Sequence, residues 1–277
     1  MTGIDLRPLD LTEIETLLSW AKAEGWNPGL ADAAAFHATD PDGFIGCFID
    51  GAMAAGISAV RYGDDLGFIG LYIAHPDYRG KGLGRRVWDA GMARLAGRTV
   101  GLDGVPEQQA NYRSMGFELD YDTFRWSGKT AGRTDTDIHA FDETMLEAII
   151  TFDRQHFPAG RETFLQKWLE PPRVVKTLLR HGEVKGYAVA RRCHEGFKIG
   201  PLFATDAADA MALIAACANE AGGQPFHIDV PITQSVFAEF LLNAGFSKSF
   251  RTSRMYLGPA PSIDLTGVFG VTTLELG

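Results

Sequence analysis

The clearest hydrophobic pattern in the chain is an apolar run at residues 68–74, which is followed by a glycine-rich basic turn and then by a segment of helical spacing. The run is rich in aromatic and β-branched residues and is long enough for a buried strand. It stops before Pro76, because proline has no N–H group to donate to a neighbouring strand. After the turn, small and apolar residues recur every four positions from Leu83 to Leu95. The pattern predicts a strand, a turn and a helix in that order.

The turn at residues 79–86 holds three glycines and four cations in eight positions. Glycine lets the backbone approach a ligand closely and adopt positive φ, so that several N–H groups can point at one phosphate. The helix that follows adds the positive end of its dipole. The turn therefore predicts a phosphate-binding site.

Strands and helices alternate through the rest of the first half. Either Asp10 or Thr12 can cap the first helix, and Asp50-Gly51 is a hairpin signal. The apolar spacing predicts strands at residues 3–7, 44–50, 52–62, 98–102 and 121–126, and helices at residues 11–21, 30–37, 83–96 and 106–115.

The segment at residues 127–137 is polar, contains two glycines and has no apolar side chain larger than alanine. Such a composition predicts a linker. We expect a first domain at residues 1–127, a linker at residues 128–137 and a second domain at residues 138–277.

The second half repeats the element order of the first. Matching anchors recur at a nearly constant offset: Asp50-Gly51 and His181-Gly182 are 131 apart, Ile69-Gly70 and Ile199-Gly200 are 130 apart, and Gly116-Phe117 and Gly245-Phe246, like Arg125 and Arg254, are 129 apart. An ordered series with matched element types predicts a duplication. The expected fold class is α/β, of the α+β type with a mixed sheet, in two tandem copies.

The composition and charge narrow the functional classes. With 45% hydrophobic and 22% charged residues in 277, the chain is typical of a soluble globular protein. Neither a membrane-spanning run nor a secretory signal is apparent, so a cytoplasmic protein without membrane contact is expected. A net charge of −9 argues against a nucleic-acid partner and favours cationic small substrates. Three cysteines without a CxxC pair predict neither disulfides nor a metal site.

Two motifs lie on these elements. Arg-x-x-Gly-x-Gly occupies residues 79–84, and Tyr-x-x-x-Gly-Phe follows at residues 112–117, where a later helix ends. In this order they resemble the motifs of the GNAT acetyltransferase superfamily, and the elements of residues 3–126 resemble its fold. The second half is similar in order but lacks both motifs. The whole chain resembles tandem GNAT proteins in which only the N-terminal copy keeps the acetyl-CoA site.

The resemblance implies that acetyl-CoA binds the N-terminal copy. In the superfamily the pyrophosphate lies on the amides of the turn, and the pantetheine arm pairs like an extra strand with the end of the preceding strand. A backbone amide there, that of Ile73, would polarise the thioester carbonyl. The cofactor-binding residues implied in this way are Tyr72, Ile73, Ala74, Arg79, Gly80, Lys81, Gly82, Leu83, Gly84 and Arg85.

Tyr112 matches the position of the superfamily's general acid. In the implied reaction an amine attacks the thioester directly, so no enzyme nucleophile is needed, and a phenol with a pKa of about 10 protonates the leaving thiolate. The alternative is that Tyr112 only packs at the end of its helix. Its neighbour Asn111 either caps or contacts the cofactor.

The general base is left open by the sequence. Many members of the superfamily place a carboxylate on the strand before the turn, but residues 68–74 contain none. The candidates are His75, Asp103 and a chain of water molecules. Trp26 falls by position near the superfamily's acceptor site, where it either lines the pocket or packs at a helix end.

The second half tests whether the motifs are functional. Residues 204–209 replace the turn with a segment that has no glycine or cation, and its Asp206 and Asp209 would repel phosphate. Leu241 stands where Tyr112 stands in the first half. We expect this copy not to bind CoA, and to cover the cleft, shape the acceptor pocket or form a dimer contact. Residues 268–276 alternate weakly and predict an added strand of unassigned partner.

The function expected from the resemblance is N-acetyl transfer from acetyl-CoA to a primary amine of a small molecule, by direct attack in a ternary complex. No metal is expected, and the protein is expected to be a monomer or a homodimer. One alternative is a non-catalytic sensor or interaction protein that binds acyl-CoA. Another is the transfer of a chain longer than acetyl.

Overall fold

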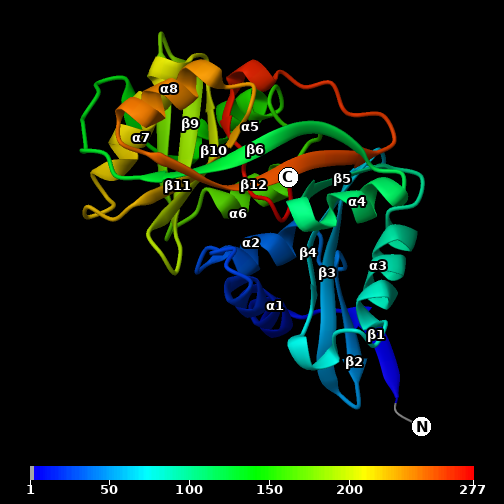
Figure 1. Cartoon of the computed structure of the whole chain (residues 1–277). Coiled ribbons are helices and arrows are strands. Elements are labelled where there is room, and N and C mark those ends of the chain that lie inside the picture. The colour runs from blue at the N-terminus through cyan, green and yellow to red at the C-terminus, as the bar shows by residue number, and fades with distance from the viewer. Residues whose placement is uncertain (1–2) are drawn as a thin grey trace.

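Strands from both halves of the chain join one mixed sheet of 13 strands in the computed structural model, which describes residues 3–277 (Figure 1). The first half contains β1 (Ile4–Pro8), α1 (Leu11–Ala23), α2 (Asp32–Thr39), β2 (Phe44–Ile49), β3 (Ala52–Tyr62), β4 (Leu66–Ala74), α3 (Leu83–Arg94), β5 (Thr99–Gly104), α4 (Pro106–Ser114) and β6 (Glu118–Gly128). The second half contains β7 (Ile138–Ala140), α5 (Leu146–Asp153), α6 (Glu162–Trp168), β8 (Val174–Arg180), β9 (Glu183–Arg192), β10 (Phe197–Ala204), α7 (Ala207–Ala218), β11 (Phe226–Pro231), α8 (Ser235–Asn243), β12 (Ser247–Leu257) and β13 (Val268–Gly270). The predicted α/β class with mixed sheet is confirmed.

Local sequence explains where α1 begins. Asp10 caps α1, since its side chain accepts from the N–H of Glu13 at 2.9 Å while Glu13 accepts from the N–H of Asp10 at 3.0 Å. This reciprocal capping box resolves the choice between Asp10 and Thr12. The helix then buries Ile14 and Leu17 in the hydrophobic core.

The last strands of the two halves are exchanged. The sheet runs in the order β5-β12-β6-β11, so that β12 of the second half pairs with β5 of the first, and β6 of the first pairs with β11 of the second. In Figure 1 the long strands β6 and β12 cross the middle of the molecule together. Each half therefore depends on the other to complete its part of the sheet.

Two buried ion pairs connect the exchanged strands in the same way. Arg254 of β12 donates from Nε and Nη2 to the two carboxylate oxygens of Asp103 on β5, at 2.9 Å each. Arg125 of β6 donates likewise to Asp229 on β11, at 2.8 and 2.9 Å. The arginines recur at the offset of the repeat, and the structure shows that each one pairs with an aspartate of the other half. Such planar bidentate pairs select one register between neighbouring strands.

The two halves also share a hydrophobic core beside the sheet. The buried side chains of α1 and α2 form one cluster with those of α5, α6 and β9. Phe36 of α2 stacks on Trp168 of α6, with ring centroids 6.1 Å apart. Among the helices of residues 3–277, none combines the length and the apolar character that crossing a membrane requires.

The end of the chain returns from the second half to the first. Only residues 268–270 of the predicted strand form one, which pairs with β10 in antiparallel orientation. The carbonyl of Glu275 accepts from Ser58 Oγ at 3.2 Å, and that of Leu276 accepts from Tyr62 Oη at 2.9 Å. A Cβ atom on Gly70 would lie 2.2 Å from the Glu275 carbonyl oxygen, so the tail lies directly against β4.

Candidate active site

Strands β4 and β5 separate half-way along their length. They pair in parallel from Leu66 and Thr99 to Ile69 and Leu102, and no pairing follows. At this point Leu71 has a φ of +46°, and the register between β3 and β4 shifts. A bulge of this kind bends a strand away from its partner. One edge of β4 is therefore left unpaired beside β5.

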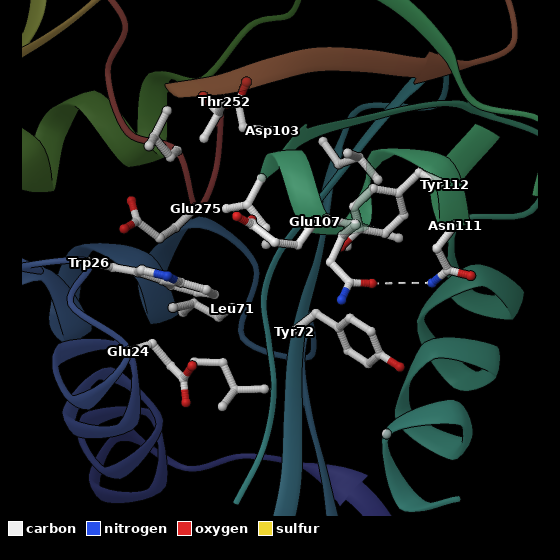
Figure 2. Close-up of a pocket in the computed structure, with 18 of the residues that line it drawn as sticks. Glu24, Trp26, Leu71, Tyr72, Asp103, Glu107, Asn111, Tyr112, Thr252 and Glu275 are labelled. Atoms are coloured by element: carbon white, nitrogen blue, oxygen red, sulfur yellow. Dashed lines mark hydrogen bonds between the residues drawn. The ribbon is translucent and has the colours of Figure 1, made fainter. Parts of the chain in front are cut away.

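The separation opens a cavity of about 660 Å³, within the range of small-molecule sites. Figure 2 shows Tyr72, Asn111 and Tyr112 towards one end and Glu24, Trp26 and Glu275 towards the other. The second half contributes Phe250 and Thr252 from β12 and two residues of the tail. The second half thus forms part of the wall of this cavity, as one of its expected roles required.

Tyr112 lines the cavity from α4 and is only 8% exposed. Its ring stacks on Trp88, with centroids 5.6 Å apart, and contacts Phe117. Burial raises the pKa of Tyr112 to about 12. The hydroxyl is therefore protonated near neutral pH and can act as a proton donor.

The glycine-rich turn precedes α3 as expected. Gly80 and Gly82 have φ values of +75° and +77°, and a Cβ atom at either would meet nothing within 4 Å. Their backbone conformation, rather than a lack of space, thus favours glycine. Gly82 is the N-cap of α3, where no side chain caps the helix and no acid occupies the first turn. The first N–H groups of α3 are free of side-chain acceptors and suit an anion.

Three of the four cations of the turn, Arg79, Lys81 and Arg85, have partners within the protein. Arg79 donates to the carbonyl of Ala74 at 3.1 Å and pairs with Glu24. Lys81 donates to the carbonyl of Asp77 at 2.8 Å, and Arg85 pairs with Asp89 at 2.6 Å. These side chains are largely exposed, and exposed pairs of this kind are weak enough to exchange partners.

The structure divides the predicted site residues into two groups. Those that line the cavity are Tyr72, Ile73, Ala74, Arg79, Gly84 and Tyr112, and those outside it, in the turn and first residues of α3, are Gly80, Lys81, Gly82, Leu83 and Arg85. The side chain of Leu83 is buried in the core, so that only its backbone can face a ligand. A Cβ atom on Gly84 would lie 3.1 Å from Tyr72 Oη, which shows how closely β4 and α3 approach.

The two candidate bases occupy different environments. Asp103 lines the cavity, but Arg254 binds both of its carboxylate oxygens. Burial raises the pKa of Asp103, and Arg254 offsets part of this effect. His75 is not among the lining residues; its ring packs against Trp20 at 5.2 Å and accepts from the N–H of Asp77.

Trp26 lines the cavity, half-buried, in the loop between α1 and α2. Its carbonyl accepts from Arg125 at 3.3 Å and from Lys198 at 2.9 Å, so strands β6 and β10 hold the loop in place. Glu24 and Glu275 also line this end, and the sequence analysis identified neither. Glu275 had no local signal, because it reaches the cavity from the far end of the chain.

Within residues 3–277, no group of three or more histidine, cysteine, aspartate or glutamate side chains is arranged to hold a metal ion. The three cysteines are buried as free thiols.

Comparison with known proteins agrees with the motifs. A model of the acetyltransferase (GNAT) family matches residues 11–117, and a model of an acetyltransferase (GNAT) domain matches residues 149–270. The chain is 31% identical to holothin acyltransferase from a Pseudoalteromonas strain, over 98% of this chain and 94% of that protein. The chain belongs to the GNAT acetyltransferase family. Its two GNAT domains lie in tandem, as the repeat indicated.

Solved GNAT structures share the fold. A putative acetyltransferase from Pyrococcus horikoshii superimposes with a TM-score of 0.83 at 17% identity, covering 100% of this chain and 97% of the other. A tandem GNAT protein from the clavulanic acid biosynthesis pathway gives a TM-score of 0.64 at 12% identity, covering 93% of this chain and 100% of the other.

The second GNAT domain differs from the first at the start of its corresponding helix. There Asp206 caps α7, accepting from the N–H of Asp209 at 2.8 Å. Asp209 is in turn bound by Arg180 at 2.6 and 2.8 Å. The N–H groups that α3 leaves free are therefore partly occupied in α7, and two carboxylates stand beside them. The buried Leu241 of α8 supplies no proton donor.

Proposed function

We propose that the protein is an acyl-CoA-dependent N-acyltransferase that transfers an acyl group, with acetyl as the expected one, to a primary amine of a small molecule. The observation that carries this proposal is that the unpaired edge of β4 and the buried Tyr112 line one cavity, which the uncapped start of α3 adjoins at Gly84. An anion site, a free strand edge and a proton donor are what a thioester of CoA needs from a protein.

The residues present fit acyl-CoA. The first N–H groups of α3, together with the exposed cations of the turn, suit a pyrophosphate. Ile73 and Ala74 lie beyond the point where β5 stops pairing with β4, so their edge can pair with an extended arm of amide groups. Gly84 lies between the anion site at the start of α3 and the free edge of β4, where α3 meets the cavity.

When bound, acyl-CoA supplies a thioester carbonyl that an amine attacks directly, with the CoA thiolate as leaving group. Tyr112 then donates its phenolic proton to the departing sulfur. The aromatic and aliphatic part of the wall, Trp26, Leu71 and Phe250, would limit the access of bulk water to this step, which disfavours hydrolysis of the thioester. The proton of the attacking amine leaves through a base that the sequence left open, and the engagement of Asp103 by Arg254 favours a route through water.

The lining of the cavity and the name of one relative support a small molecule as the acceptor. The side chains that line the cavity beyond Tyr112 combine the apolar Trp26, Leu71, Phe250 and Leu274 with the charged Glu24, Arg125 and Glu275, which suits a compact molecule with an apolar body and polar groups. The relative of 31% identity is named holothin acyltransferase, so holothin belongs among the acceptors to be tested.

The direct test is to incubate the purified protein with acetyl-CoA and longer acyl-CoA thioesters and with a panel of amines: holothin, tyramine, phenethylamine and spermidine. We expect thiol release together with an acylated product, detected by mass spectrometry, for at least one small amine. Saturable binding of acyl-CoA without product from any acceptor would overturn catalysis and favour the sensor alternative.

Replacing Gly82 with valine tests the anion site. A β-branched residue at a φ of +77° strains the cap of α3 and turns its first N–H groups away. We expect affinity for CoA to fall at least about tenfold, as read from the thermal shift on adding CoA.

Gly97→Val is the matched control, because Gly97 has a φ of +85°, equally open surroundings and a position beyond the other end of α3. It should lose comparable stability yet keep its protection by CoA. If CoA shifts the melting temperature of the Gly82→Val variant as much as that of the wild type, the turn is not part of the CoA site.

A further inference from the structure

Among residues 3–277, Glu275 has one carboxylate oxygen that is buried without a hydrogen-bond partner. The residue is 4% exposed, and its Oε2 atom has no hydrogen-bond partner in the part of the chain that the structure describes. Taking an ionised carboxylate out of water is costly unless other groups bind it. This side chain therefore has unused capacity to accept hydrogen bonds.

Within residues 3–277, the buried aspartates each accept a hydrogen bond from an arginine; even Asp32, whose Oδ1 has no partner, accepts from Arg191 through its Oδ2 at 3.2 Å. Asp103, Asp153 and Asp229 each receive two hydrogen bonds from a single arginine, at 2.6–2.9 Å. Glu275 departs from this pattern although cations lie near it. The difference indicates that its position serves something other than the packing of the core.

The nearby cations are already engaged elsewhere. Arg125 is occupied by Asp229, and Arg125 and Lys198 both donate to the carbonyl of Trp26. Burial and Arg125 lower the pKa of Lys198, while the charges of Glu275 and Asp229 offset part of this effect. Glu275 thus interacts electrostatically with nearby cations, but no cation in residues 3–277 forms an ion pair with it.

The backbone holds Glu275 firmly in place. The Oγ1 atom of Thr273 accepts from the N–H groups of Glu275 and Leu276, at 3.2 and 2.9 Å. The carbonyl of Glu275 accepts from Ser58, and the tail is pressed against Gly70 at the bulge of β4. The carboxylate is therefore presented by a rigid segment, as a recognition group requires.

The side chain lies in the cavity at the end away from Tyr112. Figure 2 shows Glu275 near Trp26, with Tyr112 and Asn111 at the opposite end. Leu71 and Leu274 line the same cavity. An acceptor whose amine faces the thioester would extend its other end between the indole and Glu275.

We propose that Glu275 selects the acceptor, by accepting a hydrogen bond from an N–H or O–H group that a compact amine carries at the end opposite its reacting nitrogen. This inference rests on the proposed acyl transfer and adds the chemical class of the acceptor. The tail of the second GNAT domain then determines the specificity of a site whose cofactor the first domain binds.

The test compares two probes that differ only in the predicted group. Tyramine carries a hydroxyl opposite its amine, and phenethylamine lacks it. We expect wild-type kcat/KM to favour tyramine by roughly tenfold or more, since leaving a buried carboxylate unsatisfied is costly. Glu275→Leu should lower kcat/KM for tyramine roughly 10- to 100-fold, to the level of phenethylamine. Glu275→Gln, which can still accept one hydrogen bond, should lie between the two.

Three measurements separate recognition from a structural role. The thermal shift on adding CoA and the KM for acetyl-CoA should not change in either variant, and the melting temperature should stay level or rise because an unpaired buried charge is removed. The exposed Glu239 offers a matched control, and Glu239→Leu should leave all of these values unchanged.

Several outcomes would overturn the inference. They are equal wild-type rates for the two probes, no acylation of tyramine while another amine is acylated, an unchanged rate for Glu275→Leu, or a Glu275→Leu variant that also loses stability and CoA protection. If the wild type binds CoA but acylates no amine at all, the proposed function itself fails, which this set of measurements distinguishes from the failure of Glu275 alone.

Discussion

Replacing Arg254 with methionine is expected to lower the free energy of unfolding by about 3–5 kcal/mol at pH 7. The reason is that the substitution leaves the carboxylate of Asp103 buried without its bidentate partner, on the strand pair that connects the two halves. Urea denaturation followed by circular dichroism measures the change. The same loss is expected for Arg125→Met, because its bond to Asp229 has nearly the same geometry.

The pH dependence of the Arg254 variant follows from the same burial. Burial raises the pKa of Asp103, and removing Arg254 takes away the charge that opposes this shift. A carboxyl group with a raised pKa in the folded state destabilises that state at pH values above its unfolded pKa, and protonation relieves the cost as the pH falls. The loss of stability should therefore be smaller at about pH 5 than at about pH 8.

Two controls belong with this experiment. Arg192→Met removes an exposed arginine and should change stability by less than about 0.5 kcal/mol. The double variant Asp103→Leu with Arg254→Met removes both charges and should recover most of the loss. A single Arg254→Met variant as stable as the wild type would show that the exchanged strands do not depend on this pair.

The second large effect is expected for catalysis. Tyr112→Phe should lower kcat by about 100-fold with a cognate amine, since it removes the proton that the leaving thiolate receives. The phenylalanine ring keeps the stack on Trp88 and the contact with Phe117, so CoA protection and melting temperature should be retained. Steady-state kinetics with both substrates varied measure the effect.

The pH profile of the wild type completes this test. Because burial raises the pKa of Tyr112 to about 12, its hydroxyl keeps the proton at all lower pH values, and kcat should show no alkaline decline from this group up to about pH 10. Tyr121→Phe is the control, as Tyr121 is buried but does not line the cavity. An unchanged kcat in the Tyr112→Phe variant would show that Tyr112 is not the proton donor and only packs at the end of α4.

The exchange of strands explains what the second GNAT domain contributes although it lacks the glycine-rich turn. This domain supplies β12 beside β5, a wall of the cavity through Phe250 and Thr252, and the tail that carries Glu275. Its α7 has its own aspartate cap in place of the free N–H groups. We infer that one copy binds the cofactor while the other shapes the space for the acceptor.

Local patterns predicted a large part of the site. The strand, the glycine-rich turn and the helix around residues 68–95 follow from residues close together in sequence, because positive φ, helix capping and apolar period are local properties. The position of Tyr112 followed from a motif with fixed spacing on α4. These residues also carry the two motifs that resemble those of GNAT proteins.

The tertiary structure alone decided which segments meet. Arg254 pairs with Asp103 over 151 positions, and Ser58 contacts Glu275 over 217. The repeat indicated that each half contains a final strand, but either half could have kept its own, since pairing within or between copies satisfies the same hydrogen bonds and the same apolar faces. The sequence by itself therefore determined most elements and the glycine-rich turn of this protein. The exchanged strands and the returning tail, which complete the acceptor end, depend on long-range packing that no local pattern records.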